Sequence, residues 1–368
     1  MKRQLIMAGS LSVIALVIAV AAATWLIWNR PARQVPGDDP VLVEIPAGMT
    51  LAAAADTLMA RGLLADRRVL LLGARLSGRA NALKAGLYAL SGTLSPRDLL
   101  DTLVSGRGVQ NRVTIPEGLA AGEVADLVAR ELFIDPADFL AAADSLVGAA
   151  LAGDRVTGGR EAVARLDSLL TVETAARSVH LHRCEGYLAP DTYLFAAGTS
   201  ETAVAIHLVD TQFARLEAAT SRRRTGQPGG HGLLVLASII EAEARRDDER
   251  ERIAAVYSNR IDLGMRLEAD PTVAHLLGKK GERLFYRDLA VRSAWNTYRV
   301  KGLPPGPIGS PGQASLQAAA RPDSTCEALF FVADGRDGHV FSRTVREHEQ
   351  AVRRFRALKS AERRNHGD

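Results

Sequence analysis

The sequence predicts an α+β protein with one small mixed module and one larger, mainly helical domain. A short strand that closes in a Pro-x-Gly turn and leads into a helix occurs at Val43–Gly48 and again at Val113–Gly118. Two further strands, Gly86–Thr93 and Thr192–Thr199, both end in Gly-Thr and both precede helices. Short strands that alternate with helices around one sheet fit a small α+β module. Beyond residue 232 the pattern is mainly helical, interrupted by a hairpin.

Length and composition narrow the possibilities. With 368 residues, the chain has room for about two domains. Hydrophobic residues make up 47% and charged residues 24%, so a packed core is possible and wholesale disorder is excluded. Aromatic residues are only 5%, which argues against a stacking platform for single-stranded nucleic acid. The net charge of +4 arises in the tail 343–368, so no large phosphate-binding face is evident and we expect no nucleic-acid partner.

The N-terminal segment is the first strong signal. Residues 5–28 are 24 consecutive positions without a charge, enough to span the roughly 30 Å hydrocarbon core of a membrane. Trp25 and Trp28 lie at one end as interface anchors, and Lys2 and Arg3 at the other end favour an N-terminus on the inside. The segment therefore predicts a membrane helix.

This reading places the chain across the cytoplasmic (inner) membrane as a single-pass protein. We expect residues 1–4 in the cytoplasm, the anchor at 5–28, and a linker at 29–40, which is rich in proline and charge. The rest of the chain then lies on the outer, periplasmic or extracellular, face. A cleaved signal peptide is the alternative, because Ala21–Ala23 fits a small-residue cleavage site.

The duplicated strand–helix units divide the chain that follows the linker. We expect a small module at 41–111 and a larger domain at 112–368. The turn residues Asp334–Gly338 predict a hairpin near the end of the larger domain. Thr344 and Glu347 then predict the cap of a basic terminal helix, whose charged face is either solvated or in contact with anionic polymers.

One apolar run leads directly into two acidic residues. Leu233–Ile240 is apolar except at Ser238, which predicts a helix buried almost all round, and Glu241 and Glu243 follow it. A carboxyl group at the lip of a core is partly desolvated, which raises its pKa. A general acid for glycosidic cleavage is made in this way. The alternative is a pair of solvated glutamates where a buried helix reaches the surface.

Several polar residues fit helix caps. Asp248 and Glu251 approximate a capping box, and Ser310 with Gln313 forms another, so Ser310 is expected to be a cap and not a nucleophile. Asp270 precedes a proline at the first position of a predicted helix. For Asp270, a cap and a role in a site stay equally open.

The segment Gly302–Gly312 holds four glycines and four prolines in eleven residues. Proline stiffens the backbone, and glycine lets a ligand approach it closely. An ordinary connection is rarely so rich in both residues, so we expect this loop to line a cleft.

The histidines and cysteines give only weak signals. On one strand, His180, His182 and Cys184 would share a face as metal ligands. No second cluster supplies a fourth ligand, so we expect neither metal nor cofactor. Cys184 could pair with Cys326 in an exported protein, or both could be unpaired thiols.

A set of motifs in one order resembles the endolytic murein transglycosylase family. These are ASIIEAEA (237–244), NRIDLGMRLEADPTV (259–273), NTYRVKGLPPGPI (296–308), FFVADGRDGHVFSRTVREH (330–348) and EGYLAPDTY (185–193). The sequence departs from that family's usual pattern at Glu268-Ala269, Ala294-Trp295 and Gly309-Ser310. These departures bear on substrate positioning and not on the reaction.

The resemblance implies a membrane-anchored lyase of the cell wall. Members of the family are single-pass membrane proteins with a LysM-like module before the catalytic domain, which suits the module at 41–111. They cleave nascent peptidoglycan strands internally, between MurNAc and GlcNAc, leave 1,6-anhydro-muramyl ends, and so end strand elongation. Their catalytic glutamate falls on Glu241. Peptidoglycan strands are the implied substrate, and peptidoglycan synthases of elongation or division are implied partners.

The chemistry agrees with a single catalytic carboxyl group. Ordinary glycosidases need two carboxylates. A lytic transglycosylase needs only one, because the C6 hydroxyl of the sugar supplies the nucleophile at high effective concentration. Within the motifs we assign substrate-binding roles to five residues: Glu185, Asp270, Thr272, Asn296 and Tyr298.

Two alternatives stay open at the level of the sequence. One is a non-catalytic, membrane-tethered scaffold that binds peptidoglycan. The other is a hydrolase that activates water with a second carboxylate, for which Glu185, Glu243 and Asp270 are the candidates.

Overall fold

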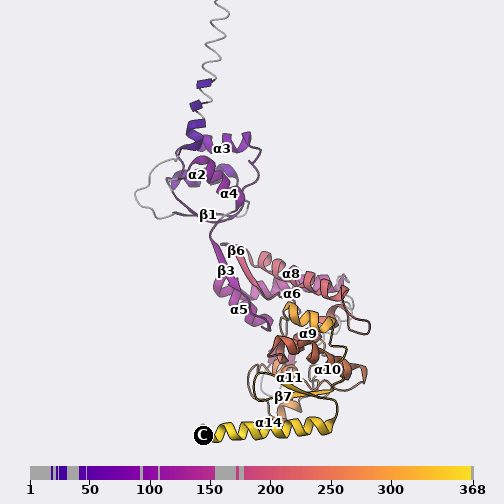
Figure 1. Ribbon diagram of the computed structural model, residues 1–368. Coiled ribbons are helices and arrows are strands. Elements are labelled where there is room, and N and C mark those ends of the chain that lie inside the picture. The colour runs from indigo at the N-terminus through magenta and orange to yellow at the C-terminus, as the bar shows by residue number, and fades with distance from the viewer. Residues whose placement is uncertain are drawn as a thin grey trace, which may run out of the picture. The chain divides into compact units, whose positions relative to one another are not determined.

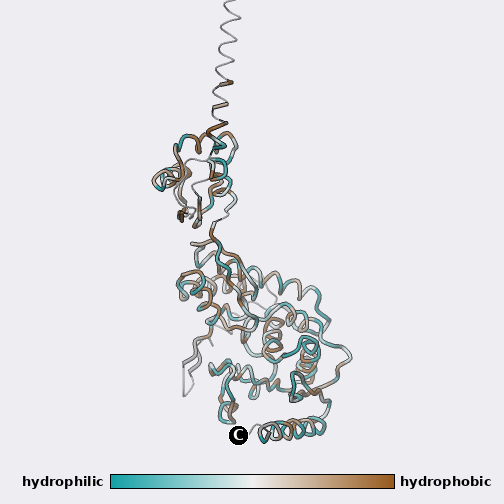
Figure 2. The backbone as a smooth tube through the Cα atoms, turned by 60° about the vertical axis from the view of Figure 1, so that its left-hand side comes forward, coloured by the Kyte–Doolittle hydropathy of each residue, from teal (hydrophilic) through white to brown (hydrophobic). Residues whose placement is uncertain are grey.

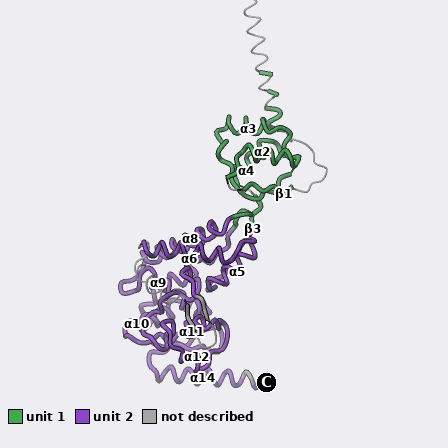
Figure 3. The backbone as a smooth tube through the Cα atoms, turned by 180° about the vertical axis from the view of Figure 1, so that it is seen from behind, with its two compact units in different colours: residues 1–112, 194–199 green, residues 113–193, 200–368 purple. Residues whose placement is uncertain are grey.

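The computed structural model describes residues 18–19, 22–23, 25–30, 41–46, 48–91, 94–106, 108–153, 171–173 and 178–365 (Figure 1). The chain forms two compact units (Figure 3). The N-terminal unit comprises Met1–Arg112 and Leu194–Thr199, and the C-terminal unit comprises Val113–Tyr193 and Ser200–Asp368. The chain passes between the units three times, within strands β3 (Gln110–Thr114) and β6 (Thr192–Ala196), which pair with each other, and again after Thr199.

The N-terminal unit follows the order β–α–α–β–α. Strands β1 (Val41–Ile45) and β2 (Gly86–Leu90) pair antiparallel. The helices are α2 (Leu51–Ala60), α3 (Arg67–Leu76) and α4 (Pro96–Ser105). Alternate residues of each strand are buried, as the period of a strand requires when one face meets a core.

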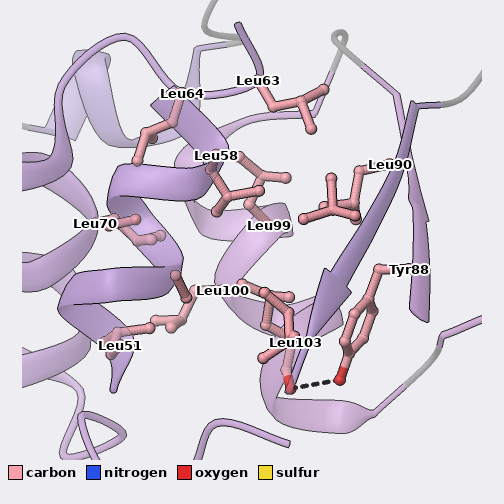
Figure 4. Packing of buried hydrophobic residues seen from close by; sticks show 14 of the residues in the cluster. Leu51, Leu58, Leu63, Leu64, Leu70, Tyr88, Leu90, Leu99, Leu100 and Leu103 are labelled. Carbon is pink, nitrogen blue, oxygen red and sulfur yellow. Dashed lines mark hydrogen bonds between the residues drawn. The ribbon is translucent and has the colours of Figure 1, made fainter. Parts of the chain in front are cut away.

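Leucines from all three helices form the core of this unit (Figure 4). Leu58, Leu70, Leu99 and Leu100 are fully buried and belong to one cluster with Tyr88 of β2. The Tyr88 hydroxyl donates to the carbonyl of Leu103 at 3.3 Å, so the polar tip of this buried ring is satisfied.

Each helix of the N-terminal unit begins at a polar cap. Thr50, Asp66 and Ser95 accept backbone N–H groups of the first turns of α2, α3 and α4, and Ser95 with Asp98 forms a capping box. We expect Ser95→Ala to lower the free energy of unfolding of this unit by about 1 kcal/mol, because first-turn donors lose their acceptor. Thermal unfolding of the full chain, beside the exposed-site control Ser105→Ala, measures this loss. A Ser95→Ala protein as stable as the control would contradict it.

The expected membrane span at 5–28 lies largely outside the described residues. Its described end, residues 25–29, is helical, and Trp28 packs against the core of the N-terminal unit over Gly73. Trp25 is exposed. Over the parts of the chain that the structure describes, no helix is both long and apolar enough to cross a membrane.

The C-terminal unit is mainly helical. Its first part contains α5 (Ala121–Leu132), α6 (Pro136–Ala152), the short antiparallel pair β4 (Thr171–Glu173) and β5 (Ser178–His180), and α8 (Glu201–Ser221). Its second part contains α9 (Gly230–Glu243), η1 (Asp247–Glu249), α10 (Arg250–Asp262), α11 (Asp270–Leu276), α12 (Tyr286–Leu289), α13 (Gln313–Ala320), β7 (Phe330–Ala333), β8 (His339–Ser342) and α14 (Val345–Asn365).

The predicted elements near the C-terminus are confirmed. Strands β7 and β8 form the antiparallel hairpin around Asp334–Gly338. The N–H of Glu347 donates to Thr344 Oγ1 at 3.3 Å at the start of α14. This helix is mainly hydrophilic along its length (Figure 2).

Three predicted caps are wrong. Asp248 binds the guanidinium of Arg246 at 2.7 and 2.9 Å and caps no helix. The helix predicted at Asp270 has Ala269 as its N-cap. The helix predicted at Ser310 begins after Gly312. Arg246 takes the Asp248 carboxylate and Tyr298 takes the Asp270 carboxylate, so two of the three groups bind partners other than a helix terminus.

Candidate active site

A cleft of about 910 Å³ opens in the C-terminal unit. Its lining comes from the segment before α5, the start of α5, the turn at 181–185, the C-terminal end of α9, the helix α11, the connection 278–284 and the Pro/Gly-rich loop. Of the predicted residues, Glu241, Glu243, Glu185 and Asp270 all line it. Elements far apart in the sequence therefore bring four carboxyl groups to one cleft.

Helix α9 carries Glu241 to the cleft. All residues from Leu233 to Ile240 are buried, as the apolar run predicts, and only the last turn reaches the cleft. The side chain of Glu241 is 8% exposed. Its Oε1 accepts a hydrogen bond from Arg250 Nη1 at 3.0 Å, and its Oε2 accepts one from the N–H of Gly312 at 3.0 Å. The carboxyl group is therefore held by one charged and one backbone donor.

Arg250 is fixed behind Glu241. It is the first residue of α10 and its side chain is 11% exposed. Its guanidinium also donates to Ser315 Oγ at 2.7 Å and to Asp247 Oδ1 at 3.2 Å. A buried guanidinium with this many partners positions a carboxylate rigidly.

The Pro/Gly-rich loop forms one wall of the cleft. Ser310 exchanges two backbone hydrogen bonds with the opposite segment, from Gly118 N–H at 2.7 Å and to Leu119 carbonyl at 2.8 Å. The N–H of Ile308 donates to Ser238 Oγ of α9 at 3.1 Å. A Cβ at Gly309 would lie 2.7 Å from the carbonyl oxygen of Gly118, so glycine permits this close approach. The expectation that this loop lines a cleft is confirmed by Ile308 and Gly309.

Glu117 is a site residue that the sequence analysis missed. It lies in the second strand–Pro-x-Gly unit, and its carboxyl group rests against the Cα of Gly312. Glu117 Oε2 is 4.0 Å from Arg250 Nη2. The Glu117 side chain is 48% exposed, and its partial burial and, next, the negative charge of Glu241 raise the pKa of Glu117. The signal that could have found it was the duplicated Pro-x-Gly turn, whose second copy has glutamate between proline and glycine.

Two other carboxyl groups of the cleft belong to Glu185, which is buried, and to Glu243, which is partly buried. Glu185 accepts the N–H of Ala121, the first residue of α5, at 3.1 Å, and burial raises its pKa to about 7. Burial also raises the pKa of Glu243 to about 7, and Tyr257 donates its hydroxyl to this residue at 3.0 Å. Glu185 therefore ties the turn at 181–185 to the start of α5.

The remaining predicted site residues lie beside or behind the wall. Tyr298 donates its hydroxyl to Asp270 Oδ1 at 2.6 Å. Thr272 is fully buried and bonds the carbonyl of Ala269 at 2.8 Å. Asn296 is fully buried, and its amide donates to the carbonyls of Leu289 and Val291. The structure brings Asp270 into the cleft but keeps the Thr272 and Asn296 side chains out of its lining, so their role as substrate contacts stays a prediction.

The strand that would align His180, His182 and Cys184 on one face, the arrangement considered for metal ligands, does not form. Strand β5 ends at His180, and His182 turns instead to Asp144 Oδ2 at 3.2 Å, which raises the pKa of His182. Cys184 is a free thiol, as is Cys326. No group of three or more His, Cys, Asp or Glu side chains suited to a metal ion occurs within the described ranges.

Comparison with known proteins identifies relatives along most of the chain. The model of the YceG-like family matches residues 43–354. An endolytic murein transglycosylase of Bacillus subtilis is 29% identical over 322 residues, which cover 87% of this chain and 86% of the relative.

A Streptococcus pneumoniae protein of the same name is 28% identical over 324 residues and covers 85% of this chain, although the match spans only 58% of that longer protein. Among solved structures, a YceG-like protein of Listeria monocytogenes matches 85% of this chain and 99% of its own, with a TM-score of 0.54 and 28% identity.

Proposed function

Because the chain belongs to the YceG-like family, we infer that it is an endolytic murein transglycosylase. It is a lyase that cleaves peptidoglycan strands internally. The structural observation that carries this function is Glu241, which is presented to a cleft of about 910 Å³ by a buried helix and is held there by two donors. A scaffold that only binds peptidoglycan has no need of a carboxyl group fixed in this way.

We propose that Glu241 acts first as acid and then as base. The bond between C1 of MurNAc and O4 of the next GlcNAc breaks, and O4 takes the proton of the Glu241 carboxyl group. The C6 hydroxyl oxygen of the same MurNAc then bonds to C1, and its proton passes to the Glu241 carboxylate. The product is a 1,6-anhydro ring, no water is consumed, and the carboxyl group is restored to its starting form.

The other cleft residues would hold the glycan strand in place. Asp270 and Glu185 line the cleft and can accept hydrogen bonds from sugar hydroxyls. Tyr298 fixes the Asp270 carboxylate from outside the lining. Thr272 and Asn296 would then act through the shape of this wall.

Cleavage in ¹⁸O-water tests the reaction itself. The new ends of long purified strands are expected to be 1,6-anhydro-muramyl groups without ¹⁸O, because the attacking oxygen comes from the substrate. Mass analysis of the ends measures this directly. Reducing ends labelled with ¹⁸O would instead identify a hydrolase, with Glu185, Glu243 or Asp270 as candidate base. A ladder of disaccharides from the outset would identify an exo-acting enzyme.

We further propose that the N-terminal unit is a LysM-like module, on the outer face of the cytoplasmic membrane, behind a retained anchor at residues 5–28. The β–α–α–β order of β1 to β2 suits such a module, and the uncharged 24-residue run suits the anchor. Peptidoglycan synthases, which produce nascent strands at the membrane, would be the partners.

N-terminal sequencing of the protein from membranes tests the anchor. If the segment at 5–28 is a retained anchor and not a cleaved signal peptide, residues 1–4 are still present at the start of the sequenced chain. A mature chain that starts near Thr24 would show a cleaved signal peptide.

A further inference from the structure

We propose that Glu117 is a second carboxyl group of the catalytic centre, which shares one proton with Glu241 across Arg250. This inference rests on the proposed function of Glu241 and assigns Glu117 a role in setting the protonation state of that residue. Glu117 is a positioning residue in this sense, since it acts on the substrate through Glu241.

The first step of the argument is that the backbone fixes Glu117 in place. Its neighbour Gly118 donates its N–H to the Ser310 carbonyl at 2.7 Å, and Lys280 donates to the Gly118 carbonyl at 2.9 Å. The first bond attaches the Glu117 segment to the Pro/Gly-rich loop that also carries Gly312, and the second attaches it to the connection 278–284.

The second step is that Gly312 and Arg250 each contact both carboxyl groups. The N–H of Gly312 donates to Glu241 Oε2. The Glu117 carboxyl group packs against the Cα of Gly312, in the space that a Cβ would take. Arg250 Nη1 lies 3.0 Å from Glu241 Oε1, and Arg250 Nη2 lies 4.0 Å from Glu117 Oε2. Two acids therefore meet around one guanidinium.

The third step is a count of the charges that face Glu117. Glu241 of α9 and Arg250 of α10 are nearest, Asp247 of η1 is on the solvent side with a side chain 92% exposed, and Arg215 of α8 acts from further away. Lys280 binds the carbonyl of the next residue and the carboxylate of Glu123. One buried cation cannot balance two carboxylates, so one proton added to the pair neutralises the Glu117–Arg250–Glu241 cluster.

The sharing solves a difficulty in the first step of catalysis. Protonation of the leaving O4 needs the acid form of Glu241, although both of its oxygens already accept hydrogen bonds from N–H groups. The negative charge of either carboxyl group opposes ionisation of the other, so the pair keeps one proton to higher pH than a lone carboxyl group would. After O4 has been protonated, both groups are carboxylates until the proton of the C6 hydroxyl arrives, and no proton is gained or lost by the pair over one cycle.

The test is the pH dependence of kcat/KM for strand cleavage by the full chain. Glu117→Gln removes a negative charge, so the catalytic acid loses its proton at lower pH and the alkaline limb is expected to move down by about one pH unit. At pH values above that limb, kcat/KM of the variant is expected to be about tenfold below that of wild type. At acidic pH, kcat/KM is expected to return to the wild-type value. Glu117→Asp keeps the charge and is expected to keep the position of the limb.

A second variant, Arg250→Gln, is expected to shift the pH profile in the opposite direction. Removing the cation favours the acid form, so the alkaline limb is expected to move to higher pH, with a lower maximal rate because Glu241 loses a partner. Asp248→Asn, an exposed carboxylate paired with Arg246, is the matched control and is expected to leave the limb in place.

Three results would overturn the proposal. A Glu117→Gln protein with the wild-type profile shows no coupling. An equal loss of rate at every pH shows a structural role only, and a raised KM with an unmoved limb shows a contact to the sugar. These outcomes leave the proposed function intact as long as the wild type produces anhydro ends. Hydrolytic ends or no cleavage by wild type would refute the proposed function instead.

Discussion

A Glu241→Gln protein is expected to fold like the wild type and to lose peptidoglycan cleavage by a factor on the order of 10² to 10⁴. Glutamine keeps the size of the side chain and can still accept hydrogen bonds from Arg250 and Gly312 through its carbonyl oxygen. It has no proton to give to the leaving oxygen and no carboxylate to take one from the C6 hydroxyl. The measurement is the rate of appearance of anhydro ends, beside circular dichroism and thermal unfolding.

Asp248→Asn is the matched control for this loss. It removes an exposed carboxylate seven positions further along the chain, outside the cleft lining, and is expected to keep the wild-type rate. Near-normal turnover in a well-folded Glu241→Gln protein would place the catalytic proton elsewhere. Glu243, which Tyr257 holds in the same helix turn, would then be examined first.

Gly186→Ala is expected to give the second large effect, a loss of about 2–4 kcal/mol in the free energy of unfolding. Gly186 has φ +77°, and an added Cβ would lie 2.5 and 2.7 Å from the ring of Pro307. Backbone strain and overpacking against a rigid ring therefore act together. The melting temperature is expected to fall by roughly 5–15 °C.

Gly264→Ala separates the two causes. Gly264 also has a positive φ of 61°, but no atom lies within 4 Å of its added Cβ. Only backbone strain acts there, so we expect a loss of about 1 kcal/mol. Equal losses in the two variants would show that the contact with Pro307 is absorbed by small shifts of the loop.

Local signals account for what the sequence could predict. The apolar run before Glu241 fixes its own helix, because burial on all sides needs no knowledge of the neighbours. The hairpin at Asp334–Gly338 and the capping box at Thr344 are likewise short-range patterns.

Long-range contacts account for what the sequence could not predict. Glu117 and Arg250 reach Glu241 only because the Pro/Gly-rich loop binds the segment before α5 and because α10 folds back on α9. The cap predicted at Asp248 fails for a related reason, since Arg246 competes for both oxygens of its carboxylate. Which partner a side chain binds depends on tertiary contacts that the local sequence pattern does not contain.

The short segment 194–199 has a consequence for how such chains can be recombined. The Ala197 carbonyl accepts the N–H of Leu87 at 3.2 Å, and the Ala197 N–H donates to the Val109 carbonyl at 2.8 Å. The N-terminal unit is therefore completed by residues 194–199, which begin within β6. The unit is therefore discontinuous in the gene. A module exchange between homologues by one junction near residue 112 would leave a donor module without its own last segment. Grafting this unit intact requires three junctions, after residues 112, 193 and 199, and natural shuffling would tend to transmit both units together.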